Sequence, residues 1–236
     1  MPTNKQPKRR QQSSRPPRAD WRDLPGQYRI EFSSGASALG ADEQDSIISV
    51  DGKVIYVSIE EEADAEIATG VLAGHVIQRG RMFDRGENVF DECDAKSQTL
   101  IDYVSAILDP STHELKEEID KQFGGIVFQN VLTIDVIESE PKHRGYNLGL
   151  AVASRLIETF GRGCGLVICK PFPLQFDINR KTDPSLSSFS KIQQPVARKK
   201  LQQYWGRLGF EPIKGTPYFG LNLDYRHPTR LDLGLE

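Results

Sequence analysis

The stretch PKHRGYNLGL, Pro141–Leu150, decides how the fold is interpreted, because a basic turn with two glycines leads there into an apolar segment. Upstream lies GIVFQNVLTIDVI, residues 125–137, whose apolar and β-branched residues predict a long strand. Downstream, apolar residues recur at helical spacing from Leu148 to Phe160, which predicts a helix. A strand, a glycine turn and a helix in this order predict one unit of a mixed α/β domain.

A turn of this kind can bind an anion, because the backbone N–H groups at a helix N-terminus lack helical partners and the helix dipole adds positive potential. Gly145 and Gly149 carry no side chain where a phosphate oxygen would approach, and Lys142 and Arg144 supply charge-assisted hydrogen bonds. The same composition is typical of a tight turn that only starts a helix. The residues of the turn leave both interpretations open.

The first part of the chain predicts strands. Order begins near Tyr28, and residues 33–46 are small and polar, which predicts a flexible stretch. The segment SIISVDGKVIYVSIE predicts a hairpin that turns at Asp51-Gly52, a pair suited to a two-residue turn. A further strand is predicted over residues 65–79, which are rich in β-branched and small residues.

Two helices are predicted between these strands and the glycine turn. The first covers residues 95–108, with its apolar residues on one face and Asp94 as its N-cap. The second is delimited by a capping box and a glycine pair: Ser111 and Glu114 at its start, Gln122 at its end, and Gly124 and Gly125 beyond it.

After the helix that follows the turn, the chain predicts four more segments. LVICKPF is a short buried strand, residues 174–194 are a polar surface loop, and residues 218–225 are a final strand. Between the last two, residues 196–208 predict a helix. Its inward residues are Leu201, Tyr204, Trp205 and Leu208.

The predicted domain organisation is a basic, disordered N-terminal tail, residues 1–27, one domain over residues 28–225, and a C-terminal tail, residues 226–236. Residues 1–22 hold seven Lys/Arg and one acid, a net charge of +6, which leaves −9 for the remainder of a chain whose total is −3. A solvated tail and an arm that contacts nucleic acid or an acidic partner are both open interpretations. The acidic body disfavours a large nucleic-acid footprint on the domain itself.

The composition suits a soluble globular protein, with 38% apolar and 27% charged residues. No run reaches the roughly 18 apolar residues of a membrane span, and no apolar stretch follows the basic N-terminus, so we expect neither a membrane contact nor a secretory signal. The three cysteines lack CxxC spacing and the four histidines are scattered, which predicts reduced thiols, a cytoplasmic setting and no metal.

The turn and a later segment, YWGRLGF at residues 204–210, carry a family resemblance. Together they resemble the GNAT superfamily of acyl-CoA-dependent N-acyltransferases, in which a strand leads to an (Arg/Gln)-x-x-Gly-x-(Gly/Ala) turn and an aromatic-x-x-Leu-Gly-Phe segment follows. The matching residues are Arg144 to Gly149 and Trp205 to Phe210. The resemblance covers residues 125–225 through both motifs and residues 46–124 by element order. It implies a GNAT-like α/β fold with a mostly antiparallel central sheet flanked by helices.

The sequence departs from the family pattern at two positions. Asn147 stands where glycine is usual, and asparagine is the non-glycine residue that best tolerates left-handed backbone, so we expect the turn to form. Trp205 stands where the family usually has a tyrosine that protonates the departing thiolate of coenzyme A, and an indole cannot do this. Tyr204 is adjacent but points about 100° away on a helix, and Tyr218 competes with it for the acid role.

The resemblance implies that acetyl-CoA, or another acyl-CoA, is the co-substrate and that its pyrophosphate lies on the amides of the turn. The pantetheine arm would pair with the end of the long strand, because a strand that splays from its neighbour leaves N–H and C=O groups for an amide-bearing chain. The implied cofactor-binding residues are Ile137, Ser139, Arg144, Gly145, Tyr146, Asn147, Leu148, Gly149 and Leu150.

The implied reaction is direct attack of an amine on the thioester, whose carbonyl a backbone N–H polarises. The amine must be uncharged to attack, so a carboxylate should accept the ammonium proton, and Asp135 and Glu138 are the nearest candidates in sequence. Acids at a strand end are often simply solvated, but Asp135 lies within the apolar run TIDVI. The predicted catalytic residues are Asp135, Glu138 and Tyr204.

Three functional hypotheses follow from these observations. The first is an N-acyltransferase, most simply an N-acetyltransferase, that acts on a small-molecule or peptide amine. The second is a catalytically inactive acyl-CoA-binding or protein-interaction module, which Asn147 and Trp205 favour. The third is a nucleic-acid-associated protein led by its basic tail. A homodimer is open as the oligomeric state, because final strands in this family often contribute to dimers.

Overall fold

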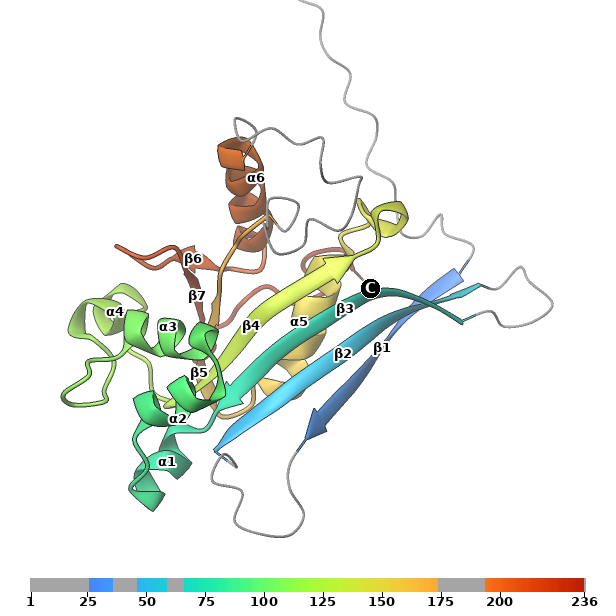
Figure 1. The fold of residues 1–236 in the computed structure, drawn as a ribbon. Helices are drawn as coiled ribbons and strands as arrows, with labels where there is room; N and C mark the ends of the chain where they lie inside the picture. The colour runs from blue at the N-terminus through green and yellow to red at the C-terminus, as the bar shows by residue number, and fades with distance from the viewer. Residues whose placement is uncertain (1–25, 36–45, 59–65, 174–193, 236) are drawn as a thin grey trace, which may run out of the picture.

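The computed structural model describes residues 26–35, 46–58, 66–173 and 194–235 of the 236-residue chain. Within them, three strands and four helices precede a long strand, which is followed by a helix, a strand, a helix and two short strands (Figure 1). Almost all of the predicted N-terminal tail and of the predicted loop over residues 174–194 lies outside the described residues.

The described strands form one seven-stranded sheet in the order β1-β2-β3-β4-β5-β7-β6. The β4–β5 pair is parallel, and every other neighbouring pair is antiparallel. The predicted mixed α/β fold with a mostly antiparallel sheet is therefore confirmed. The strands are β1 (Gly26–Gly35), β2 (Ile47–Ser58), β3 (Glu66–Ile77), β4 (Asn130–Ser139), β5 (Cys164–Cys169), β6 (Glu211–Pro212) and β7 (Phe219–Asn222).

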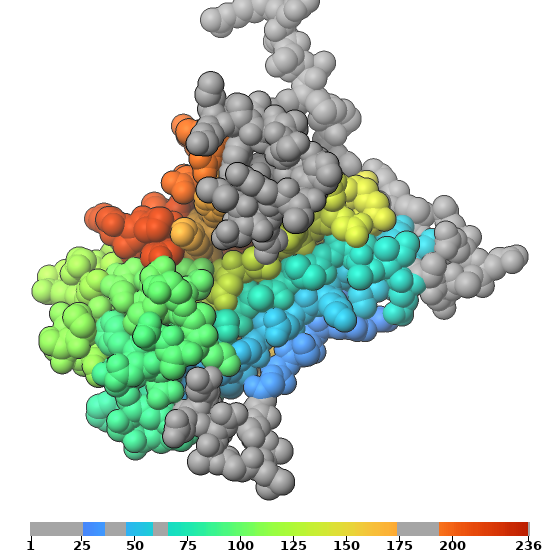
Figure 2. Space-filling model, viewed as in Figure 1, coloured from blue at the N-terminus to red at the C-terminus, as the bar shows by residue number. Residues whose placement is uncertain are grey.

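Helices cover both faces of the sheet. The helix α5 lies on one face, and the four helices between β3 and β4 lie on the other (Figure 1). In the view of Figure 2, these four helices cover one end of the sheet, while β1, β2 and β3 extend beyond them. The helices are α1 (Arg79–Arg85), α2 (Val89–Lys96), α3 (Gln98–Ile107), α4 (Glu117–Gln122), α5 (Leu148–Phe160) and α6 (Gln194–Gly206).

The central strands are buried on both faces, so successive residues enter different cores. In β4, Leu132 packs in the core beneath α5 and Val131 packs in the core beneath α3. In β5, Val167 packs in the core beneath α5 and Leu166 packs in the core beneath α3. This alternation follows from the two-residue period of a strand, and it explains why both strands are continuous apolar runs in the sequence.

The predicted hairpin at Asp51-Gly52 is wrong. The strand β2 runs straight through this pair, and Gly52 lies opposite Phe32 of β1 and Leu72 of β3. A Cβ atom at Gly52 would come within 2.7 Å of the Leu72 Cδ2 atom, so the glycine makes room for close packing rather than for a turn. Pairing on both sides overrides the local turn signal. The strand β1 also continues to Gly35, three residues into the stretch predicted to be flexible.

The predicted helix over residues 95–108 forms as α3, which begins at Gln98, and residues 95 and 96 instead end the separate helix α2. Ser97 ends α2 and caps α3, because its hydroxyl oxygen accepts a hydrogen bond from the Leu100 amide. Asp94 therefore lies inside α2 and is not the N-cap. The short helix α1 was not predicted.

The predicted capping box at Ser111 and Glu114 does not form. The Asp109 carboxylate instead accepts hydrogen bonds from the amide and the hydroxyl of Ser111, which makes a local turn, and α4 begins at Glu117. The predicted end of that helix is confirmed, since the chain leaves α4 through Gly124 and Gly125 with positive φ.

The strands and helices around the glycine turn are confirmed in type and shifted in extent. The strand β4 begins at Asn130, five residues later than predicted, and continues to Ser139. The helix α5 matches its predicted range, with Leu148, Val152 and Leu156 buried. The final strand is shorter than predicted, and the two-residue strand β6 that pairs with it was not foreseen.

Candidate functional site at the end of the β4–β5 ladder

The parallel ladder between β4 and β5 stops before β4 does. Its last pair is Ile134 with Cys169, yet β4 continues over Asp135–Ser139, of which residues 136–139 pair only with β3 among the described residues. We call this last pair the ladder end, and the side of Asp135–Ser139 that faces away from β3 the β4 edge. Strand groups without a ladder partner can bind an extended chain that carries amides.

The glycine turn follows the β4 edge directly. A short 3-10 turn at Pro141–His143 leads to Gly145, with φ +100°, and to Asn147, with φ +58°, before α5 begins at Leu148. The expectation that asparagine adopts left-handed backbone here is confirmed. None of the amides of residues 145–149 donates a hydrogen bond to another described residue. These amides and the N-terminus of α5 form a local concentration of donors beside the β4 edge.

The C-terminal part of α6 holds this turn. The Tyr204 hydroxyl accepts a hydrogen bond from the Leu150 amide at 3.0 Å, and the Arg207 Nη1 atom donates to the Asn147 Oδ1 atom at 2.7 Å. A Cβ atom at Gly149 would lie 3.1 Å from the Tyr204 hydroxyl oxygen. Gly149 therefore leaves room for Tyr204, whereas Gly145 has no atom of another element within 4 Å of its Cβ position.

The remaining predicted cofactor residues lie along the same path. Ile137 and Ser139 belong to the β4 edge and are half-buried, and the Arg144 Nε atom donates to the carbonyl oxygen of Ser139 at 3.0 Å. Arg144 thereby ties the turn to the end of β4. The structure thus brings Ile137, Ser139 and residues 144–149 into one continuous strip, while the Leu150 amide is already engaged by Tyr204.

On the face covered by α3, Asp135 forms a pair with His75. The Asp135 Oδ2 atom lies 2.8 Å from the His75 Nδ1 atom, and both side chains are largely buried, with exposed fractions of 18% and 17%. Register places Gly74 opposite Ile134 and Ala73 opposite Val136, so Asp135 is the extra residue of a β-bulge. Its Oδ1 atom is buried and has no hydrogen-bond partner among the described residues.

Three residues that sequence reasoning missed gather at the ladder end with Asp135: His75 from β3, Tyr103 from α3 and Lys170 directly after β5. The Tyr103 hydroxyl donates to the Ile134 carbonyl oxygen at 3.4 Å, and the nearby backbone N–H of Lys170 partly offsets the rise in the pKa of that hydroxyl. Burial, with the nearby Asp135 carboxylate, raises the pKa of Tyr103, so its phenol stays protonated.

Tyr218 adds a second aromatic ring to this cluster. Its ring centroid lies 5.0 Å from that of Tyr103, and the Lys170 Nζ atom lies 6.0 Å from the Tyr218 centroid. A tyrosine on an apolar helix face and a lysine after a strand give no signal of a site in the sequence, because their meeting depends on how β5 is registered against β4.

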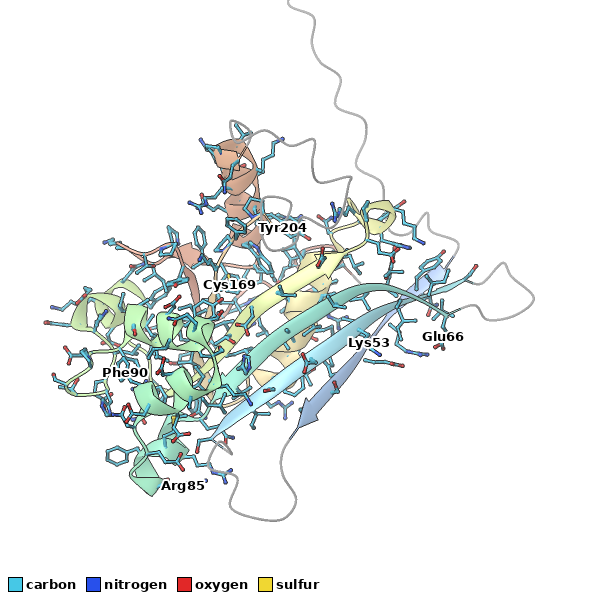
Figure 3. All side chains as sticks on the ribbon, in the orientation of Figure 1. Lys53, Glu66, Arg85, Phe90, Cys169 and Tyr204 are labelled. Carbon is cyan, nitrogen blue, oxygen red and sulfur yellow. The ribbon has the colours of Figure 1, made fainter. Side chains whose placement is uncertain are left out.

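The predicted catalytic residues do not form one cluster. Asp135 faces α3, whereas Tyr204 lies on α6 at the N-terminus of α5, and Figure 3 labels Tyr204 together with Cys169 of β5, which belongs to the core against which Tyr204 packs. Glu138 belongs to the β4 edge, three residues beyond the bulge residue Asp135. Trp205, at the position where the family's acid is usual, is buried against Phe210 with ring centroids 5.6 Å apart.

The cysteines are free and buried, as expected for core residues. Burial raises the pKa of Cys93 to about 12 and that of Cys164 to about 11, so both remain thiols near neutral pH. Within the described ranges, no group of three or more His, Cys, Asp and Glu side chains is arranged to hold a metal ion.

Comparison of this chain with models of protein families, with curated proteins and with solved structures finds no match. Among the helices that the structure describes, none is long and apolar enough to cross a membrane.

Proposed function

We propose that the protein is an acyl-CoA-dependent N-acyltransferase, most simply an N-acetyltransferase. The observation that carries the proposal is the continuity between the β4 edge and the glycine turn: one strand leaves its parallel neighbour at Ile134 and ends five residues later beside a set of amides that have no acceptor among the described residues. A ligand with an extended amide-bearing arm and a phosphate group matches both parts at once.

In this proposal the pyrophosphate of acyl-CoA is bound by the amides of residues 145–149, and Arg144 adds charge. The pantetheine arm runs along Ile137 and Ser139 and pairs with the β4 edge. The thioester then lies near the ladder end, where a backbone N–H polarises its carbonyl. The acyl group faces the α3 side of the sheet, on which Asp135 and His75 lie.

The acceptor is a small-molecule or peptide amine that approaches from the α3 side. Its ammonium form gives a proton to Asp135, and His75 fixes the orientation of that carboxylate through the 2.8 Å contact between its Nδ1 atom and Asp135 Oδ2. The neutral amine attacks the thioester, so a C–N bond forms, the C–S bond breaks and the thiolate of coenzyme A takes up a proton. The role of Tyr204 as the acid in that last step stays a prediction.

Calorimetric titration with acetyl-CoA tests the proposal. We expect a Kd on the order of micromolar for the unaltered protein and a loss of at least about tenfold in affinity for Gly145→Val, because a β-branched residue cannot adopt the positive φ of the turn without strain. Gly86→Val is the matched control: Gly86 also has a positive φ, +69°, and open space around its Cβ position, but it ends α1. Absence of binding to a folded wild-type protein would contradict the proposal.

A second function, an acyl-CoA-binding module without catalysis, is favoured by one observation. The position of the usual acid is occupied by Trp205, which packs in the core and has no ionisable group. Micromolar binding of acetyl-CoA, together with no release of free thiol in the presence of a broad set of amines, would support this second function over the first.

A further inference from the structure

The register of β4 against β5 would allow one more backbone hydrogen bond beyond the last pair of the ladder. The Leu223 amide donates to the Gly165 carbonyl oxygen, so Gly165 directs its backbone groups toward β7. Because these directions alternate along a strand, Cys169 also faces β7 and Lys170 faces β4. With Ile134 opposite Cys169, the next parallel bond would run from the Lys170 amide to the Ile134 carbonyl oxygen.

The Tyr103 hydroxyl occupies the place of that bond. It donates a long hydrogen bond of 3.4 Å to the Ile134 carbonyl oxygen, the acceptor that the Lys170 N–H would need, and it lies close to that N–H. The side chain is 1% exposed, and it reaches the ladder end from α3, where neighbouring Leu100, Val104 and Ile107 are also buried. A hydroxyl that is both donor and acceptor can stand between an N–H and a C=O and satisfy both groups.

We propose that Tyr103 is a positioning residue whose hydroxyl keeps β5 from pairing with β4 beyond Ile134, so that the β4 edge stays available to an extended amide-bearing chain. The identity of that chain as the pantetheine arm of acyl-CoA rests on the proposed function; the separation of the two strands does not.

Two other features near the ladder end do not account for its position. The bulge at Asp135 shifts the register of β4 against β3, on the opposite side of β4 from β5. Pro171 and Pro173 lack amide hydrogens and limit the length of β5, but Lys170 precedes them and keeps its N–H. The Tyr103 hydroxyl lies near this N–H and donates to the Ile134 carbonyl oxygen with which it would pair.

The test is Tyr103→Phe, which removes the hydroxyl and keeps the buried ring. We expect the Lys170 N–H and the Ile134 carbonyl to pair directly, because the carbonyl of buried Ile134 would otherwise lose its donor. Nuclear magnetic resonance should then detect a scalar coupling across that hydrogen bond, from the Lys170 nitrogen to the Ile134 carbonyl carbon, that is absent in the wild type. Calorimetry should show the Kd for acetyl-CoA raised by at least about tenfold.

Tyr225→Phe is the control, since it also removes a hydroxyl that donates to a backbone carbonyl, that of Gly124 at 2.7 Å. It should leave both the coupling pattern and the affinity at wild-type values. If wild type and Tyr103→Phe bind acetyl-CoA equally, or if no Lys170–Ile134 coupling appears, the proposal for Tyr103 is overturned. If the wild type does not bind acetyl-CoA, the proposed function fails, and the coupling alone decides whether Tyr103 separates the strands.

Discussion

The two halves of β4 differ in strand pairing, in burial and in the polarity of their side chains. Residues 131–134 are paired on both sides, with β3 and β5, and Val131, Leu132 and Ile134 are at most 3% exposed. Residues 135–139 are half-buried and include two acids and a serine; among the described residues, 136–139 pair only with β3, and Asp135 is the bulge residue. The first half of the strand therefore belongs to the core, and the second half belongs to the candidate site.

The difference follows from the backbone hydrogen bonds and the packing of each half. In the first half two ladders take up the backbone groups and both faces meet a core, so apolar side chains are favoured throughout. In the second half the described residues supply only the ladder with β3, and the side chains, such as that of Asp135, are half-buried. The comparison predicts that substitutions in the first half alter stability and that substitutions in the second half alter binding and turnover.

The largest expected effect tests the chemical role of the second half. Asp135→Asn keeps the size of the side chain but removes the proton acceptor, so the rate of thiol release from acetyl-CoA with an amine acceptor should fall by about 10²- to 10⁴-fold. The Kd for acetyl-CoA should stay near its wild-type value, because Asp135 faces α3 and not the glycine turn. Steady-state kinetics and calorimetry measure the two quantities.

Glu138→Gln separates the two predicted carboxylates. If Asp135 accepts the proton, the loss in Glu138→Gln should be much smaller than that in Asp135→Asn. A larger loss in Glu138→Gln would transfer the role of proton acceptor to Glu138 and leave Asp135 as the partner of His75.

The next effect contrasts one apolar residue from each half. Leu132→Ala should lower the free energy of unfolding by about 2–5 kcal/mol, since Leu132 is fully buried between two paired strands. Ile137→Ala should cost less than about 2 kcal/mol, because Ile137 is only half-buried in the β4 edge. Urea denaturation measures both values, and equal losses would remove the stability difference between the two halves.

The strand, the turn and the helix that carry the glycine motif could be predicted from the sequence, because their signals are local. The left-handed backbone at Asn147 was predictable for the same reason. The meeting of His75, Tyr103 and Lys170 was not predictable, since it depends on a one-residue bulge at Asp135 and on the register of β5 against β4. Both are properties of long-range pairing, which also turned the apparent hairpin at Asp51-Gly52 into a continuous strand.

A smaller effect concerns the hydrogen bond to the turn from Arg207, the residue directly after α6. Arg207→Ala removes the 2.7 Å hydrogen bond to Asn147 Oδ1, so the left-handed residue loses a support and the Kd for acetyl-CoA should rise by about three- to tenfold. Arg162→Ala, beyond the other end of α5, removes the same charge from an exposed position and serves as the control. An equal rise in both variants would indicate a general electrostatic effect instead of the loss of this local hydrogen bond.

The smallest effect lies just beyond the β4 edge, at His143. This side chain is buried beside Tyr28 and Tyr56, its Nδ1 atom lies 2.8 Å from the Tyr28 hydroxyl, and Lys142, Glu140 and Tyr146 are the other titratable groups of this region. Burial, and then the charge of Lys142, lower the pKa of His143. A lowered pKa in the folded state favours folding above the ordinary histidine value of about 6.5, and this contribution is lost as the pH falls through the folded-state value.

Between about pH 7.5 and about pH 5.5, the wild type should therefore lose more unfolding free energy than His143→Gln. Glutamine does not titrate, and its side-chain oxygen can still accept the hydrogen bond of the Tyr28 hydroxyl. Urea denaturation at each pH gives the two slopes, and the other titrating groups contribute equally to both proteins. Identical slopes would mean that His143 is protonated as easily in the folded chain as in the unfolded one, and that the end of the β4 edge is no more sensitive to acid than the rest of the sheet.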